Sequence, residues 1–267
     1  MAGSGMVHVN GTQLYYDEAG DGPPMLFIHG MGGDATVWAD QMQRLSSQFH
    51  CVAYDRRGHS RSPLGHITQR TVELHADDAA QLIVELGLAP CIIVGSSGGA
   101  RVALDVLRRY PRLIKGAVLS EPPVSALDPD GGKSFVALIK PPVEAAVANG
   151  GPRAAVDAFL EIVCPGLWRA LPEARREVPY RANAAEVLAD LAMPQYQIAR
   201  ADLARVRVPC LMLCGSESDP TLRTITGILA ESTPGAQLVE LAGSGHVTYF
   251  EQPTAFAAAV RAFAVQL

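Results

Sequence analysis

Residues 92–100 constrain the fold of this chain more than any other stretch. The stretch opens with apolar, mostly β-branched residues, breaks into the small residues Gly95-Ser96-Ser97-Gly98-Gly99, and then resumes with helical spacing. Glycines on both sides of Ser97 let the strand and the helix approach closely, so that the serine sits at a strained backbone position. The pattern therefore predicts a buried strand, a tight turn that exposes the Ser97 hydroxyl, and a helix.

Short apolar strands alternate with helical segments along most of the chain. An N-terminal hairpin is predicted around Asn10-Gly11. Further strands are predicted near 25–28, 51–54, 116–120, 210–214 and 237–241, with helices near 38–45, 71–86 and 222–231 and from about 254. This alternation is typical of a parallel sheet with helices on both faces, so the predicted fold class is α/β.

Residues 122–205 interrupt this rhythm. The strand signal disappears, alanine and proline are frequent, and helical pieces are predicted near 154–163 and 184–192. A segment of this length is too long for a plain loop. We therefore expect it to form a helical layer, or cap, over a core made of residues 1–121 and 206–267.

Charge and cysteine content limit the classes of partner. The chain carries 22 Lys and Arg against 27 Asp and Glu and has no basic block, so neither nucleic acid nor an anionic membrane is an expected partner. It has no apolar run of the ~20 residues that cross a bilayer, and its N-terminus lacks a signal-peptide pattern. Four of the five cysteines, at positions 51, 91, 210 and 214, fall in predicted buried strands. We interpret them as core residues of a cytoplasmic protein and expect no metal site.

A serine hydroxyl is a poor nucleophile at neutral pH unless a base lies within hydrogen-bonding distance. His246 is the favoured base, because it lies in a loop of small residues directly after the last predicted strand. That loop opens at the carboxyl edge of the sheet, where sites form in open α/β folds. His29 also follows a strand, but we expect it to position its own loop.

Four motifs follow one another in a revealing order: His29-Gly30, Asp55-Arg56-Arg57-Gly58, the turn around Ser97, and Gly243-Ser244-Gly245-His246. Their order and spacing resemble those of the α/β-hydrolase superfamily, and the resemblance covers nearly the whole chain outside 122–205. It implies a mostly parallel eight-stranded sheet with one antiparallel edge and a helical cap. It also implies a catalytic triad in the chain order serine, acid, histidine.

The same resemblance implies an oxyanion hole. Two backbone N–H groups must point at the negative charge of a tetrahedral intermediate. Gly98 would supply one at the N-terminus of a helix, and Met31 would supply the other, after His29-Gly30. Asp55 and Arg56 would pin the loop beside them.

The acid has two candidates. In this superfamily it usually follows the seventh strand, but Ser218 occupies the common position here and Asp219 comes one residue later. Some relatives, including the fungal zearalenone-type lactone hydrolases, place the acid after the sixth strand, where Glu121 lies. We favour Glu121, because a carboxylate at the end of a buried strand is unfavourable without a partner, whereas Asp219 suits a turn before proline.

These features predict a serine hydrolase that cleaves a small carboxylic ester or lactone through an acyl-enzyme on Ser97, without cofactor or metal. Alternatives on the same triad are a C–C bond hydrolase, a thioesterase or a cofactor-free haloperoxidase, and another is a ligand receptor with residual hydrolysis.

Four aromatic residues of the insert are expected in the cap core, with at least one lining the pocket: Phe135, Phe159, Trp168 and Tyr196. The natural substrate and the oligomeric state are not predicted.

Overall fold

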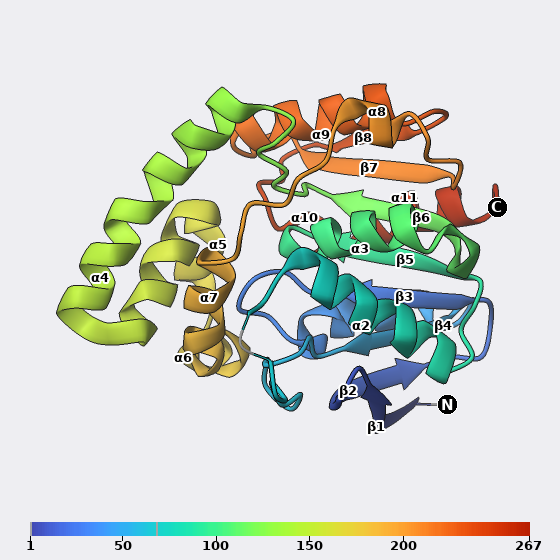
Figure 1. The fold of residues 1–267 in the computed structure, drawn as a ribbon, viewed down its shortest axis with the longest axis horizontal. Coiled ribbons are helices and arrows are strands. Elements are labelled where there is room, and N and C mark those ends of the chain that lie inside the picture. Colours follow the sequence, from blue (N-terminus) through green and yellow to red (C-terminus); the bar gives the residue numbers. More distant parts are fainter. Residues whose placement is uncertain (1, 68) are drawn as a thin grey trace.

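The computed structural model describes residues 2–67 and 69–267 (Figure 1). Its strands form one eight-stranded sheet in the order β1-β2-β4-β3-β5-β6-β7-β8. They are β1 (Ala2–Val9), β2 (Thr12–Ala19), β3 (Pro24–Ile28), β4 (His50–Tyr54), β5 (Cys91–Ser96), β6 (Ile114–Ser120), β7 (Cys210–Gly215) and β8 (Gln237–Leu241). β2 pairs antiparallel with both β1 and β4, and the other neighbours are parallel. The predicted α/β fold with an antiparallel edge is confirmed.

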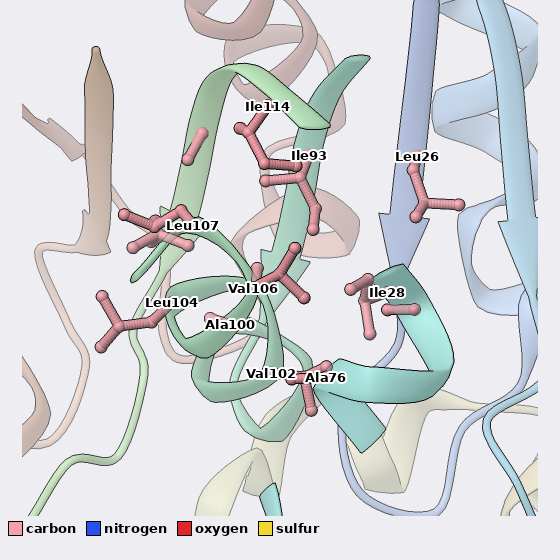
Figure 2. Close-up of a cluster of buried hydrophobic side chains, with 14 of the residues drawn as sticks. Leu26, Ile28, Ala76, Ile93, Ala100, Val102, Leu104, Val106, Leu107 and Ile114 are labelled. Carbon is pink, nitrogen blue, oxygen red and sulfur yellow. The ribbon is translucent and has the colours of Figure 1, made fainter. Parts of the chain in front are cut away.

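Successive apolar side chains of the central strands point to opposite faces of the sheet, and each face is covered by a layer of helices. In β3, Leu26 and Ile28 join the hydrophobic cluster on one face, whereas Met25 and Phe27 join the cluster on the other. The first face is covered by α2 (Val72–Glu85), α3 (Gly98–Arg109), α8 (Arg200–Leu203) and α9 (Pro220–Ser232). Figure 2 shows α3 side chains packed with those of β3 and β5. The second face is covered by α1 (Ala39–Leu45), α10 (Thr248–Glu251) and α11 (Pro253–Ala264), together with the short helix η1 (Ala35–Trp38). The short helix η2 (Pro111–Leu113) packs on the first face, against α2 and α3.

The strand order reverses at β3, which has β4 on one side and β5 on the other. The connections that leave β3 and β5 therefore diverge to opposite faces and leave a crevice at the carboxyl ends of these strands. Gly30 and Met31 follow β3, and Ser97 follows β5. The topology thus brings the candidate oxyanion loop and the candidate nucleophile together.

The long segment between β6 and β7 is helical. It contains α4 (Pro129–Val163), α5 (Pro165–Ala170), α6 (Glu173–Arg175), η3 (Arg176–Tyr180), η4 (Arg181–Asn183) and α7 (Ala184–Leu191). Figure 1 shows α4 to α7 grouped beyond one end of the sheet, and their apolar residues form a hydrophobic cluster of their own. The first half of α4 was not predicted, because Pro141 and Pro142 argue against a helix interior. Gly151, with φ of 74°, breaks the helix before its second half.

The end of this segment returns to the sheet. Tyr196, Ile198 and Leu203 belong to the core cluster around α3, and α8 packs against α9. The division of the chain at 122–205 remains our proposal, and these contacts place its last ten residues against the core. Among the helices of the described residues, none is long and apolar enough to span a membrane.

Candidate active site

Ser97 lies in the tight turn between β5 and α3. Its φ of 54° and ψ of −120° are unusual for a residue with a side chain. Two backbone hydrogen bonds hold this conformation: the Ser97 N–H donates to the Ser120 carbonyl at 2.9 Å, and the Ala100 N–H donates to the Ser97 carbonyl at 3.0 Å. The strained turn therefore has a fixed geometry.

The glycines of this turn are required by close backbone approach. A Cβ on Gly95 would lie 2.5 Å from the Gly99 carbonyl oxygen, and a Cβ on Gly99 would lie 2.2 Å from the Ile28 carbonyl oxygen. No side chain fits at such distances. The sequence pattern around Ser97 thus reflects the contact of α3 with β5 and β3.

The candidate base and a carboxylate form a direct pair. His246 Nδ1 lies 2.6 Å from Glu121 Oε2, and the Glu121 side chain is fully buried. An ionised carboxylate can only accept hydrogen bonds, so Nδ1 carries the proton and Nε2 is free to accept one. Both His246 and Ser97 line the same pocket.

Two further donors hold the Glu121 carboxylate, one at the last residue of β7 and one in the turn that follows it. The Gly215 N–H donates to Oε1 at 2.7 Å, and the Ser218 hydroxyl donates to Oε2 at 2.6 Å. Ser218 stands where the superfamily usually has its acid, so the structure places a donor to the carboxylate at that position. The other candidate, Asp219, caps α9 by accepting the Thr221 N–H at 2.8 Å. Glu121 itself has a φ of 45°, another strained backbone position.

Glu251 holds the backbone of the His246 loop from both sides. Its Oε2 accepts the Gly245 N–H at 2.7 Å, and its Oε1 accepts the Val247 N–H at 3.1 Å. No motif in the sequence marks Glu251, although it lies only five positions after the candidate base.

The two candidate oxyanion amides lie close to Ser97. A Cβ on Gly98 would lie 3.6 Å from the Met31 nitrogen, and a Cβ on Gly30 would lie 3.3 Å from Ser97 Cβ. Gly98 is the first residue of α3, so helix geometry leaves its N–H without an intrahelical acceptor. The arrangement can present two N–H groups to an oxygen next to Ser97.

His29 and Asp55 hold the loops around the site. His29 Nε2 accepts the Arg56 N–H at 2.9 Å, so the proton lies on Nδ1, which donates to the Gly30 carbonyl at 2.8 Å. Burial, with the charge of Arg56, holds the pKa of His29 well below its usual value, so the ring is neutral. Asp55 accepts the Ala35 N–H at 2.8 Å and forms an ion pair with Arg61. Both residues have the positioning contacts that the sequence suggests.

A narrow pocket of about 50 Å³ lies over Ser97. Its walls come from α4, α5, η3, α10 and the loop after β8, and include Phe159, Trp168, Tyr180 and Tyr249. Burial raises the pKa of both tyrosines, so their hydroxyls are neutral. The pocket therefore suits an uncharged, mainly apolar group.

Of the four aromatic residues considered in the sequence, Phe159 and Trp168 line this pocket. Phe135 packs at the border of the α4–α7 cluster. Tyr196 was expected in the cap core, but this was wrong: it packs in the core cluster around α3, where its hydroxyl donates to Asp105 at 2.9 Å. Within residues 2–67 and 69–267, no group of three or more potential metal ligands is gathered in one place.

Comparison with known proteins gives the same picture of the fold. Residues 25–259 match the family described as Alpha/beta hydrolase family. This chain belongs to that family. As an α/β hydrolase it is 38% identical to the hydrolase YraK of Bacillus subtilis (strain 168) over 120 residues, which are 45% of this chain and 44% of YraK. The aligned part is thus less than half of either protein.

Two solved structures resemble this α/β hydrolase over nearly their whole length. A thermophilic esterase from Thermogutta terrifontis has a TM-score of 0.76 and 25% identity, over 96% of this chain and 94% of its own. The enol-lactonase from Burkholderia xenovorans LB400 has a TM-score of 0.77 and 24% identity, over 98% and 100% of the two chains. At 24% identity, the likeness to the enol-lactonase establishes the shared fold alone.

Proposed function

We propose that this α/β hydrolase cleaves a carboxylic ester or lactone through an acyl-enzyme on Ser97. The observation that carries the proposal is the 2.6 Å contact between His246 and Glu121 beside the pocket that contains Ser97. A base oriented by a buried carboxylate is what a serine nucleophile requires. The likeness to the thermophilic esterase from Thermogutta terrifontis supports an ester substrate.

In the proposed reaction, Ser97 Oγ attacks the carbonyl carbon while His246 Nε2 takes the hydroxyl proton. Glu121 stabilises the resulting imidazolium, and the Met31 and Gly98 N–H groups bind the oxyanion. His246 then gives the proton to the leaving alkoxide, and the carbon–oxygen bond to that alkoxide breaks. Water, deprotonated by His246, attacks the acyl-enzyme; its proton goes to Ser97 Oγ, and the carboxylic acid leaves.

The pocket suggests which substrates fit. Its small volume and its aromatic and aliphatic walls favour a compact, uncharged acyl group or a small lactone ring. We propose that α4 and α5 act as the cap that selects this group, because Phe159 and Trp168 come from them.

A panel of p-nitrophenyl esters, small lactones and macrocyclic lactones tests the proposal. We expect turnover of short-chain esters or lactones, and covalent labelling by a serine-directed phosphonate that is lost in Ser97→Ala. A ligand-dependent thermal shift without any turnover, or unchanged labelling of Ser97→Ala, contradicts it.

A further inference from the structure

The candidate oxyanion loop, residues 30–33, is held by side chains whose role the proposed reaction leaves unexplained. The Gly30 carbonyl accepts hydrogen bonds from His29 Nδ1 at 2.8 Å and from Arg56 Nη2 at 3.2 Å. The N–H of the same peptide belongs to Met31. In a trans peptide the C=O and N–H point in opposite directions. Two donors on the carbonyl therefore fix the direction of the Met31 N–H.

Arg56 is in turn fixed by α7. The same Nη2 atom donates to Asp190 Oδ2 at 2.6 Å, and both side chains are 1% exposed. Burial alone would raise the pKa of Asp190, but the charge of Arg56 beside it holds that pKa well below its usual value. Asp190 is therefore ionised, and it is a strong acceptor for the guanidinium.

Asn183, just before α7, holds the other end of the same loop. Its Nδ2 donates to the Gly32 and Gly33 carbonyls, each at 3.2 Å. Its Oδ1 accepts the Ser60 N–H at 2.8 Å, which fixes which way the amide faces. The Val187 side chain of α7 also packs closely against Gly32, since a Cβ added at Gly32 would lie 2.9 Å from Val187 Cγ2. Residues 183–190 thus lie directly on the loop.

We infer that Asn183 and Asp190 are positioning residues through which residues 183–190 of the helical layer set the Met31 oxyanion donor. The inference rests on the proposed function. Asn183 acts on the loop directly, and Asp190 acts through Arg56. The helical layer then contributes to transition-state stabilisation as well as to the substrate pocket, because a donor is effective only while it points at the developing charge.

The test compares Asn183→Ala and Asp190→Asn with Glu186→Gln. Glu186 is the matched control, because it ties α7 to Arg70 at 2.5 Å without contacting residues 30–33. Each variant is assayed on an ester and on its thionoester analogue, whose sulfur is a weaker acceptor than oxygen. Thermal unfolding confirms that each variant is folded; if Asp190→Asn is unfolded, Asn183→Ala alone decides.

We expect Asn183→Ala and Asp190→Asn to lower kcat by about 10- to 100-fold with little change in KM, which is less than the ~10²–10³-fold loss of a whole oxyanion donor. The rate ratio of ester to thionoester is expected to fall by about tenfold in both and to stay unchanged in Glu186→Gln. If the two variants behave like Glu186→Gln, the inference is wrong while the proposed function stands. If the unaltered protein neither turns over an ester or lactone nor reacts with the phosphonate, the proposed function itself fails.

Discussion

Replacing Glu121 by glutamine is the sharpest test of the proposed acid. The carboxylate receives three donors, from His246 Nδ1 at 2.6 Å, Ser218 Oγ at 2.6 Å and Gly215 N at 2.7 Å. Glutamine keeps the shape of the side chain but has a single oxygen, and its NH₂ group is itself a donor. The three donors therefore cannot all be satisfied in the variant.

Two orientations of the new amide are possible, and each is unfavourable. If its oxygen faces Gly215, its NH₂ faces His246 Nδ1, and the imidazole must move its proton to Nε2, where it can no longer accept the Ser97 proton. If its oxygen faces His246, its NH₂ meets the buried Gly215 N–H. Two donors then face each other without an acceptor, and an unpaired buried donor lowers stability by about 1–3 kcal/mol. We expect Glu121→Gln to lose roughly 10³- to 10⁴-fold in kcat; the upper value corresponds to about 5.4 kcal/mol.

The assay is kcat/KM on a p-nitrophenyl ester, with urea unfolding measured in parallel to separate stability from catalysis. Asp219→Asn is the matched control, since asparagine also caps a helix, and we expect it to lose less than about tenfold. If Glu121→Gln keeps more than a tenth of the activity while Asp219→Asn is inactive, Glu121 is not the acid.

The remaining predictions concern the base, the pocket and a buried histidine. His246→Ala is expected to lose as much ester turnover as Ser97→Ala, and the double variant little more, because a triad acts as a unit; additive losses in kcat would exclude His246 as the base. Phe159→Ala enlarges the pocket and is expected to raise kcat/KM for longer acyl chains by roughly tenfold relative to short ones, whereas Val136→Ala, at an exposed position of α4, leaves the ratio unchanged. His75 is buried, and among the described residues neither of its ring nitrogens has a hydrogen-bond partner; burial, with the charge of Arg56, holds its pKa well below 6.5. The unfolded chain therefore binds a proton below about pH 6.5 that the native state does not, and stability falls as pH falls. Urea unfolding at pH 7.5 and 5 should show a smaller loss of stability in His75→Leu than in the unaltered protein; equal losses would contradict this assignment.

The parts of the molecule that the sequence predicted are those encoded locally. The strands at 25–28 and 51–54 follow from continuous apolar runs, and the turn around Ser97 follows from glycines at fixed positions on either side of it. Each of these patterns reports a nearest-neighbour constraint, either burial on both faces of the sheet or close backbone approach. These strands and this turn can therefore be predicted without knowing which distant segments contact them.

The parts that were missed depend on contacts between distant segments. Asp190 and Arg56 are 134 residues apart, and no local pattern marks them as partners. Ser218 could have been recognised as a donor to Glu121, since it stands where an acid is usual and is followed by a capping residue. The first half of α4 was hidden because its prolines argue against a helix, and the helix forms where packing within the layer outweighs that preference.

The contact of Glu251 with the two amides that flank His246 has a consequence for how this protein tolerates sequence change. The donors and the carboxylate lie between positions 245 and 251, so one short stretch of chain builds the support of its own histidine. Substitutions elsewhere in the fold that slightly shift the helices on either face therefore move His246 and Glu251 together. The acid has no such protection, since Glu121 is 125 residues away from His246 and must be brought to it by the register of three neighbouring strands. Substitutions that change the spacing of β6, β7 and β8 are therefore the ones that separate the pair.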